Sequence, residues 1–119
     1  CRALLDEVHD GVRIDGVMVG RAAYQTPWML SEVDSVLYGE SCRTLTREAV
    51  IAAVEAEVEQ YYAADEHVTR AFARHLNGLC QGLSGARVWR RTLADPKIIK
   101  AEGPNLYRRA WREAFGTDF

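Results

Sequence analysis

The segment from Asp15 to Tyr24 (DGVMVGRAAY) constrains the fold of this chain more than any other stretch. Residues 17–19 form a continuous apolar run, which is typical of a strand that is covered on both faces. Gly20 follows, and glycine lets the backbone turn sharply and approach a ligand closely. The next residues favour a helix, whose first free N–H groups and dipole can seat a phosphate. The pattern predicts a strand at residues 16–19, a glycine turn and a helix, although such turns also occur without a ligand.

The first third of the chain has the rhythm of an α/β fold with parallel strands. Residues 3–9 resemble the end of a helix, and a loop, the strand and a second helix through Leu37 follow. One strand cannot form a sheet, and the chain begins at Cys1 within a helical pattern, so we expect a piece of a longer protein. We expect residues 1–24 to be disordered, refolded or paired with another copy, with self-association through the orphan strand.

After a polar stretch at residues 39–43 the sequence predicts helices alone. The predicted domains are therefore 1–40, the end of an α/β unit, and 41–119, a helical bundle. Helices are predicted at 46–62, 66–81 and 84–94, with a last one from Gly103-Pro104. Thr46 and Ser84 are expected N-caps, Gly82 is an expected C-terminal stop, and Asp95-Pro96 is expected to end the helix at 84–94. The periodicity assigns these residues to the core: Val50, Val54, Val58, Tyr61, Val68, Phe72, Leu76, Leu79, Cys80, Ala86, Trp89, Leu93, Leu106, Ala110, Trp111 and Ala114.

The net charge of −2 hides an asymmetry between the two parts of the sequence. Residues 1–65 carry 5 basic and 12 acidic side chains, whereas residues 66–119 carry 10 basic and 5 acidic ones. A positive second part is typical of proteins that face a polyanion such as nucleic acid. Mutual attraction between the two parts explains the same asymmetry equally well.

The arginines of the second part recur at helical spacing. One side of the second predicted helix combines Arg70, Arg74, Asn77 and Gln81. The third carries Arg87, Arg90 and Arg91 outward, and the last carries Arg108, Arg109 and Arg112. The planar guanidinium donates two hydrogen bonds at once and so suits phosphate. RNA contact and salt bridges to the acidic first part are the two interpretations of these arginines.

The cysteines and histidines indicate no metal or disulfide chemistry. Three cysteines are widely spaced without a CxxC pattern, and the three histidines have no metal-ligand spacing. No apolar run approaches the length of a membrane span, and no signal peptide is found. We therefore expect a cytoplasmic protein with no membrane or metal partner.

Two motifs resemble a known family. Residues 15–28 (DGVMVGRAAYQTPW) are similar to the last barrel strand and following helix of the tRNA-dihydrouridine synthases. Residues 75–93 (HLNGLCQGLSGARVWRRTL) resemble the helical-domain signature of these enzymes, and the similarity is closest to the A subfamily. The sequence has Cys80 where the family usually has an aromatic residue, and Thr26 where it has asparagine. Neither departure touches a residue that we assign to chemistry.

The resemblance implies a fold and a reaction. The family has an N-terminal (β/α)8 TIM barrel that holds FMN, followed by a helical domain that grips tRNA, so the chain would contain the last βα unit and a C-terminal bundle. The implied reaction reduces uridine in tRNA to 5,6-dihydrouridine. NADPH reduces the flavin, flavin N5 gives hydride to C6, and a cysteine acid protonates C5. The base must leave its stack to reach the flavin.

Few site residues carry over from the resemblance. Gly20 and Arg21 match positions at the FMN phosphate, and Arg87 and Arg90 match basic positions that meet tRNA. Weaker RNA-binding candidates, from charge geometry alone, are Arg91, Arg70 and Arg74. The cysteines of this chain do not match the catalytic cysteine, so no catalytic residue is assigned. We expect the isolated chain to be inactive and to bind no FMN.

Two alternatives of a different class remain. A stand-alone helical module that binds RNA or protein without catalysis explains the arginines and the bundle, but not the βα unit. A flavin barrel that acts on small molecules explains the glycine turn, but not the arginine-rich helices.

Overall fold

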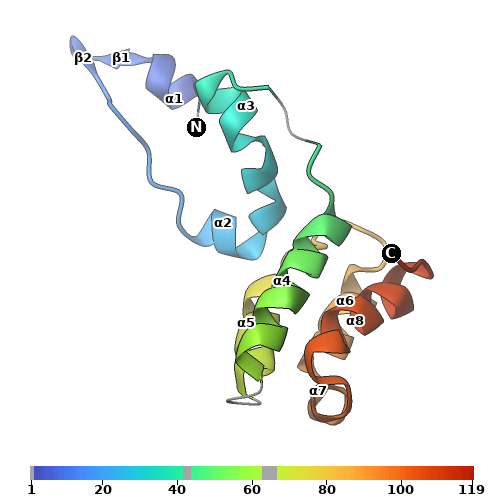
Figure 1. Ribbon diagram of the computed structural model, residues 1–119. Coiled ribbons are helices and arrows are strands. Elements are labelled where there is room, and N and C mark those ends of the chain that lie inside the picture. Colours follow the sequence, from blue (N-terminus) through green and yellow to red (C-terminus); the bar gives the residue numbers. More distant parts are fainter. Residues whose placement is uncertain (1, 42–43, 63–66) are drawn as a thin grey trace.

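Helices account for nearly all regular structure in this chain. The computed structural model describes residues 2–41, 44–62 and 67–119 (Figure 1). The N-terminal part contains α1 (Arg2–Asp6), β1 (Val8–His9), β2 (Val12–Arg13), α2 (Arg21–Gln25), the 3-10 helix η1 (Pro27–Glu32) and α3 (Val33–Tyr38). The C-terminal part contains α4 (Arg47–Tyr62), α5 (His67–Leu76), α6 (Ala86–Ala94), α7 (Pro96–Glu102), the 3-10 helix η2 (Gly103–Asn105) and α8 (Leu106–Phe115). The mostly helical fold class is confirmed.

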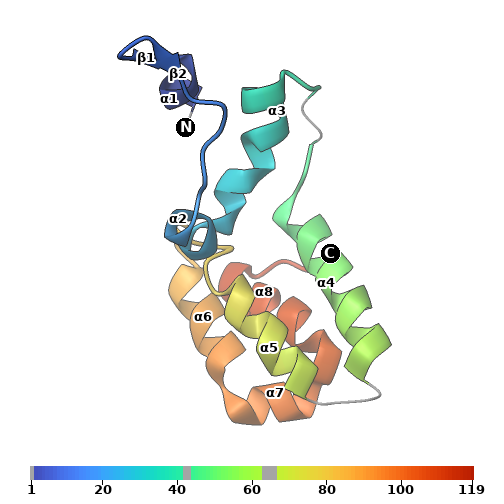
Figure 2. The ribbon, with the colours of Figure 1, turned by 90° about the vertical axis from the view of Figure 1, so that its left-hand side faces the viewer.

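Helices α4, α5, α6 and α8 pack side by side around one core, and α7 closes one end of the bundle (Figures 1 and 2). Trp89 and Tyr107 are the largest fully buried side chains. Trp89 Nε1 donates a hydrogen bond to the Leu76 carbonyl at 2.9 Å, and the Tyr107 hydroxyl donates to the Thr69 carbonyl at 2.8 Å. Both polar groups are therefore satisfied inside the core, and they fasten α5 to α6 and to α8.

The predicted core faces of the later helices are largely confirmed. Trp111 packs edge-to-face on Trp89, with ring centroids 6.4 Å apart, so both tryptophans are core anchors as expected. Cys80 is fully buried, also as expected. On α4 the buried positions are Ile51 and Val58. The expectation for Tyr61 was wrong, because half of this side chain is exposed.

Some helix ends differ from the prediction. The Thr46 hydroxyl accepts a hydrogen bond from Ala49 N at 3.1 Å, which confirms the expected N-cap of α4. Helix α5 ends at Leu76 rather than near residue 81, and the chain then turns through residues 77–82. At Gly82 the backbone has a φ of +86°, a conformation that favours glycine.

Two predictions around α6 and α7 were wrong. Ser84 does not cap α6, because Gly85 occupies the N-cap position and no side chain bonds to the first turn. The sequence Asp95-Pro96 ends α6 as predicted, but it also starts α7, which the prediction missed. Asp95 Oδ1 accepts a hydrogen bond from Lys97 N at 2.8 Å, so the residue that follows α6 is also the N-cap of α7.

The predicted buried strand at residues 16–19 is not present. These residues have no regular structure, and Met18 is 88% exposed. The two described strands, β1 and β2, form a small antiparallel hairpin instead. A strand needs neighbours to pair its backbone groups, and the described residues offer none to residues 16–19. Self-association through this segment stays a prediction, as does the division into domains 1–40 and 41–119.

The N-terminal part contacts the bundle at the turn between α5 and α6 (Figure 2). A Cβ atom at Gly78 would lie only 2.2 Å from the Gln25 carbonyl oxygen. The Arg47 guanidinium lies 4.1 Å from the centre of the Trp28 ring, and its Nε donates to the Leu79 carbonyl at 2.9 Å. Helix α2 is thereby positioned beside the turn that follows α5.

Candidate nucleic-acid interface

The arginines of α8 are paired with carboxylates. Arg108 donates from Nε and Nη2 to Glu55 Oε2 at 3.1 and 2.8 Å, and its backbone N–H donates to Glu55 Oε1 at 3.1 Å. Hydrogen bonding to Glu55 raises the pKa of Arg108. Arg112 Nε lies 3.3 Å from Asp118 Oδ2. Arg108 thus pairs with the acidic first part of the chain, as the salt-bridge interpretation expects, whereas Arg112 pairs with a carboxylate of the second part.

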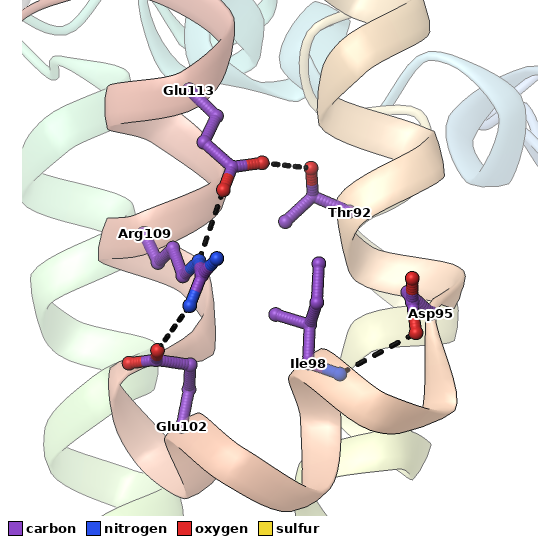
Figure 3. Close-up of polar contacts among 6 residues, drawn as sticks. All are labelled: Thr92, Asp95, Ile98, Glu102, Arg109 and Glu113. Atoms are coloured by element: carbon purple, nitrogen blue, oxygen red, sulfur yellow. Dashed lines mark hydrogen bonds and ion pairs between the residues drawn. The ribbon is translucent and has the colours of Figure 1, made fainter.

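Arg109 belongs to a second carboxylate network, which joins α6, α7 and α8 (Figure 3). Its guanidinium bonds to Glu102 and, at 3.0 Å, to Glu113. The other oxygen of Glu113 accepts a hydrogen bond from the Thr92 hydroxyl at 2.8 Å. The hydrogen bond from Thr92, and then that from Arg109, lower the pKa of Glu113. The positive charge of Arg109 is therefore already compensated, by two carboxylates.

The arginines of α5 and α6 differ from those of α8 in that they form no salt bridges within the described residues. All five side chains are exposed, and within the described ranges none of them lies within salt-bridge distance of a carboxylate. Arg90 Nη1 donates instead to the neutral Gln81 Oε1 at 2.9 Å. Uncompensated guanidinium groups on adjacent helices attract anions and can bind phosphates bidentately. The structure thus separates two groups of arginines that look alike in the sequence: Arg70, Arg74, Arg87 and Arg90, which are uncompensated, and Arg108, Arg109 and Arg112, which are paired. Arg91 stands between the groups, because it makes no salt bridge but its charge helps to lower the pKa of Glu113.

Two of the uncompensated arginines line a cleft of about 430 Å³ between α2 and the α5–α6 turn, which we call the arginine cleft. Its walls carry no carboxylate among the described residues. Although α5 ends at Leu76, Asn77 and Gln81 still line the same side as Arg74. The lining residues are Tyr24, Gln25, Thr26, Arg74, Asn77, Gly78, Gln81 and Arg90.

Sequence reasoning missed the contribution of Tyr24 to this cleft. The Tyr24 ring lies edge-on to His75, with centroids 5.8 Å apart, and its hydroxyl donates to the Arg74 carbonyl at 3.4 Å. More than half of the side chain is exposed. A contact across 50 residues has no local sequence signal, so only the packing of α2 against the α5–α6 turn could place this ring beside the arginines.

Gly20 and Arg21 lie at the opposite end of α2, outside the arginine cleft. The helix begins at Arg21 directly after Gly20, which confirms the predicted helix start. The Arg21 side chain is exposed, and no carboxylate of the described chain pairs with it. An exposed guanidinium at the first turn suits a phosphate. The neighbouring residues 14–18 are mostly exposed, so this end of α2 offers polar donors for an anion but no enclosed surface for a flat ring.

Cys80 is not a candidate nucleophile. Burial raises the pKa of its thiol to about 11, so the thiolate is scarce at neutral pH. The described part of the chain holds no cluster of three or more residues that could ligate a metal. None of its helices combines the length and the apolar character that a membrane span requires.

Comparison with known proteins agrees with the two motifs. A sequence profile described as "Dihydrouridine synthase (Dus)" matches residues 4–115. The chain belongs to the dihydrouridine synthase family. No solved structure matches it.

Curated members of the family cover most of this chain. The chain is 48% identical to the tRNA-dihydrouridine(20/20a) synthase of Shewanella oneidensis over 102 residues. This alignment covers 83% of the chain and 29% of the Shewanella protein. Over 97 residues the chain is 37% identical to the enzyme of the same name from Vibrio vulnificus, covering 82% of the chain and 29% of the relative. The Synechocystis enzyme is 34% identical over 97 residues, with the same coverage. The chain thus spans less than a third of the length of these relatives.

Proposed function

We propose that this chain is the C-terminal part of a flavin-dependent tRNA-dihydrouridine synthase. The whole protein would reduce uridine in tRNA to 5,6-dihydrouridine, with NADPH as reductant and FMN as carrier, in the cytoplasm. Membership in the dihydrouridine synthase family supports this proposal, as do the names of the relatives. Within this protein, the chain would contribute the end of the FMN barrel and a helical domain that binds tRNA.

The observation that carries tRNA binding is the lack of charge compensation on α5 and α6. Arg108, Arg109 and Arg112 are occupied by carboxylates, so they have little to offer to a phosphate. Arg87 and Arg90 are exposed, lie three residues apart on α6 and have no acidic partner in the described part of the chain. We assign Arg87 and Arg90 to the phosphates of tRNA, with Arg70, Arg74 and Arg91 around them.

The proposed FMN contact is confined to Gly20 and Arg21. When bound, FMN supplies the hydride that reduces the base. In this chain, the N–H groups of the first turn of α2 and the Arg21 guanidinium would hold the FMN phosphate. The catalytic cysteine belongs to the rest of the protein, so the chain alone is expected to be inactive.

Binding of tRNA across a series of salt concentrations tests the helical part of this proposal. Replacing Arg87 or Arg90 by alanine should weaken binding and reduce the slope of log affinity against log salt by about 1 each. Arg112→Ala is the matched control, because it removes an exposed arginine that is already paired with Asp118. The slope of log affinity against log salt for Arg112→Ala should match that of the unsubstituted chain.

Either of two results would contradict the proposed role of these helices. One is the absence of tRNA binding at low salt. The other is an equal loss of slope in Arg87→Ala, Arg90→Ala and Arg112→Ala, since compensated and uncompensated arginines would then contribute alike. Circular dichroism of each variant excludes loss of the fold as the cause.

A further inference from the structure

The arginine cleft contains more than cations. Arg74 and Arg90 share its walls with the Tyr24 ring and with the amides of Asn77 and Gln81. A surface that binds only a phosphate backbone needs positive charge and little else. An aromatic ring and amide groups beside the charge are the components with which proteins bind an exposed base. The combination therefore indicates a ligand larger than a phosphate.

The two arginines of the cleft keep their positive charge available to a ligand. Gln81 Oε1 accepts the hydrogen bond from Arg90 at 2.9 Å, which holds one guanidinium group in place without neutralising it. That bond uses the acceptor of Gln81 and leaves its NH₂ group as a donor. Arg74 lies on the opposite helix, α5, with no carboxylate in the described chain to compensate it. A phosphate between the two helices would meet charge from both.

The aromatic ring in the cleft is fixed but still accessible. The edge contact with His75 and the bond from the Tyr24 hydroxyl to the Arg74 carbonyl hold one side of the ring. The side chain nevertheless remains 57% exposed. A ring that is immobilised in this way can stack on a base without a large loss of side-chain entropy.

We propose that the arginine cleft binds one unpaired nucleotide of an RNA strand. Its phosphate lies between Arg74 and Arg90, its base stacks on Tyr24, and the amide of Asn77 bonds to the base edge. The volume of about 430 Å³ lies within the usual range of small-molecule pockets, about 300–1,000 Å³. An RNA duplex keeps its bases stacked and cannot supply such a base, whereas a loop or single strand can. The choice of RNA as the partner rests on the proposed function.

Fluorescence anisotropy with a short labelled oligouridylate tests the cleft directly, with an RNA duplex of equal length for comparison. The single strand should bind more tightly than the duplex. Tyr24→Leu should weaken its binding about fivefold or more without changing the salt slope, because stacking carries no charge. Arg90→Ala should instead reduce that slope by about 0.7. Tyr24→Phe, which keeps the ring, should retain most of the affinity.

The matched control is Tyr38→Leu, which removes another exposed tyrosine at the end of α3, away from the cleft. The same oligonucleotide with 4-thiouridine should crosslink to peptides that contain residues 24–26 or 77–81. The proposal is overturned if Tyr24→Leu and Tyr38→Leu bind alike, or if the duplex binds as tightly as the single strand. Crosslinks confined to other peptides would also overturn it.

The tRNA experiment and the oligonucleotide experiment test the two proposals independently. If tRNA binds through Arg87 but the single strand does not bind, the nucleotide cleft is refuted while the tRNA-binding role stands. If the single strand binds in the cleft but tRNA does not, the proposed tRNA-binding role of the helices is refuted while the cleft stands.

Discussion

Replacing Gly78 by alanine tests whether α2 and η1 are docked on the bundle as a fixed unit. The added Cβ would lie 2.2 Å from the Gln25 carbonyl oxygen, 2.7 Å from its carbon and 2.9 Å from Pro27 Cδ. Ordinary contacts of a Cβ atom begin near 3.4 Å. The closest atoms belong to the backbone, so no side-chain rotation relieves the overlap. The α2–η1 segment must move away from the turn.

The size of the effect follows from what attaches this segment. The Arg47–Trp28 contact is worth about 0.5–1 kcal/mol. The edge-to-face contact of Tyr24 with His75 is worth about 0.5–1.5 kcal/mol. Forcing a methyl group into a packed site costs about 1–3 kcal/mol, which is similar to their sum. Undocking the segment is therefore cheaper than unfolding the bundle.

Hydrogen–deuterium exchange read by mass spectrometry distinguishes the two outcomes. Peptides that cover residues 21–32 should exchange faster in Gly78→Ala. The Thr26 and Met29 amides donate to carbonyls within this same segment, so these hydrogen bonds open more easily once the segment leaves the bundle. Peptides from α6 and α8 should keep their protection. The control is Gly16→Ala, since a Cβ there meets nothing within 4 Å.

Unchanged exchange over residues 21–32 in Gly78→Ala would refute the docked arrangement. Equal acceleration in every helix would refute the inference that this contact is separable from the core. Because α2 forms one wall of the arginine cleft, Gly78→Ala should also weaken binding of the single-stranded oligonucleotide, as Tyr24→Leu does.

Three further predictions concern the bundle. Tyr107→Phe removes the buried hydroxyl that donates to the Thr69 carbonyl, and should lower the free energy of unfolding in urea by about 1 kcal/mol. The Cys80 thiol, with its pKa raised to about 11, should resist iodoacetamide at about pH 8 until urea unfolds the chain, as alkylation mapped by mass spectrometry would show. Glu113 has a lowered pKa in the folded state, so its contribution is present above its ordinary pKa of 4.5 and is lost as the pH falls through the lower folded value. The stability difference between the unsubstituted chain and Glu113→Gln should therefore shrink between about pH 7 and about pH 3, whereas an unchanged difference would contradict the assigned contact with Thr92.

The helices of the bundle could be predicted because their signals are local. The apolar spacing that places Trp89 and Trp111 in the core depends on neighbours three and four residues away. The cap at Thr46 likewise depends on the next three residues. Helix α7 was missed because the pair Asp95-Pro96 is compatible both with the end of one helix and with the beginning of another.

What could not be predicted depends on distant contacts. A continuous apolar run such as residues 17–19 is compatible with a buried strand, but a strand forms only where other strands pair with it. The sequence also could not distinguish Arg108 from Arg90. Both lie on amphipathic helices, and the carboxylate that compensates Arg108 belongs to Glu55, which is 53 residues away.

The charge asymmetry between the two parts of the chain thus has two physical causes rather than one. Part of the positive charge serves the fold, since Arg108 pairs with Glu55 from the acidic part. Four of the arginines on α5 and α6 (Arg70, Arg74, Arg87 and Arg90) find no such partner in the described chain, although acidic side chains are plentiful on α4. An uncompensated like-charged cluster opposes folding slightly, through mutual repulsion. A bound polyanion would remove that repulsion, so the surface that stabilises the bundle least is also the one on which we propose that RNA binds.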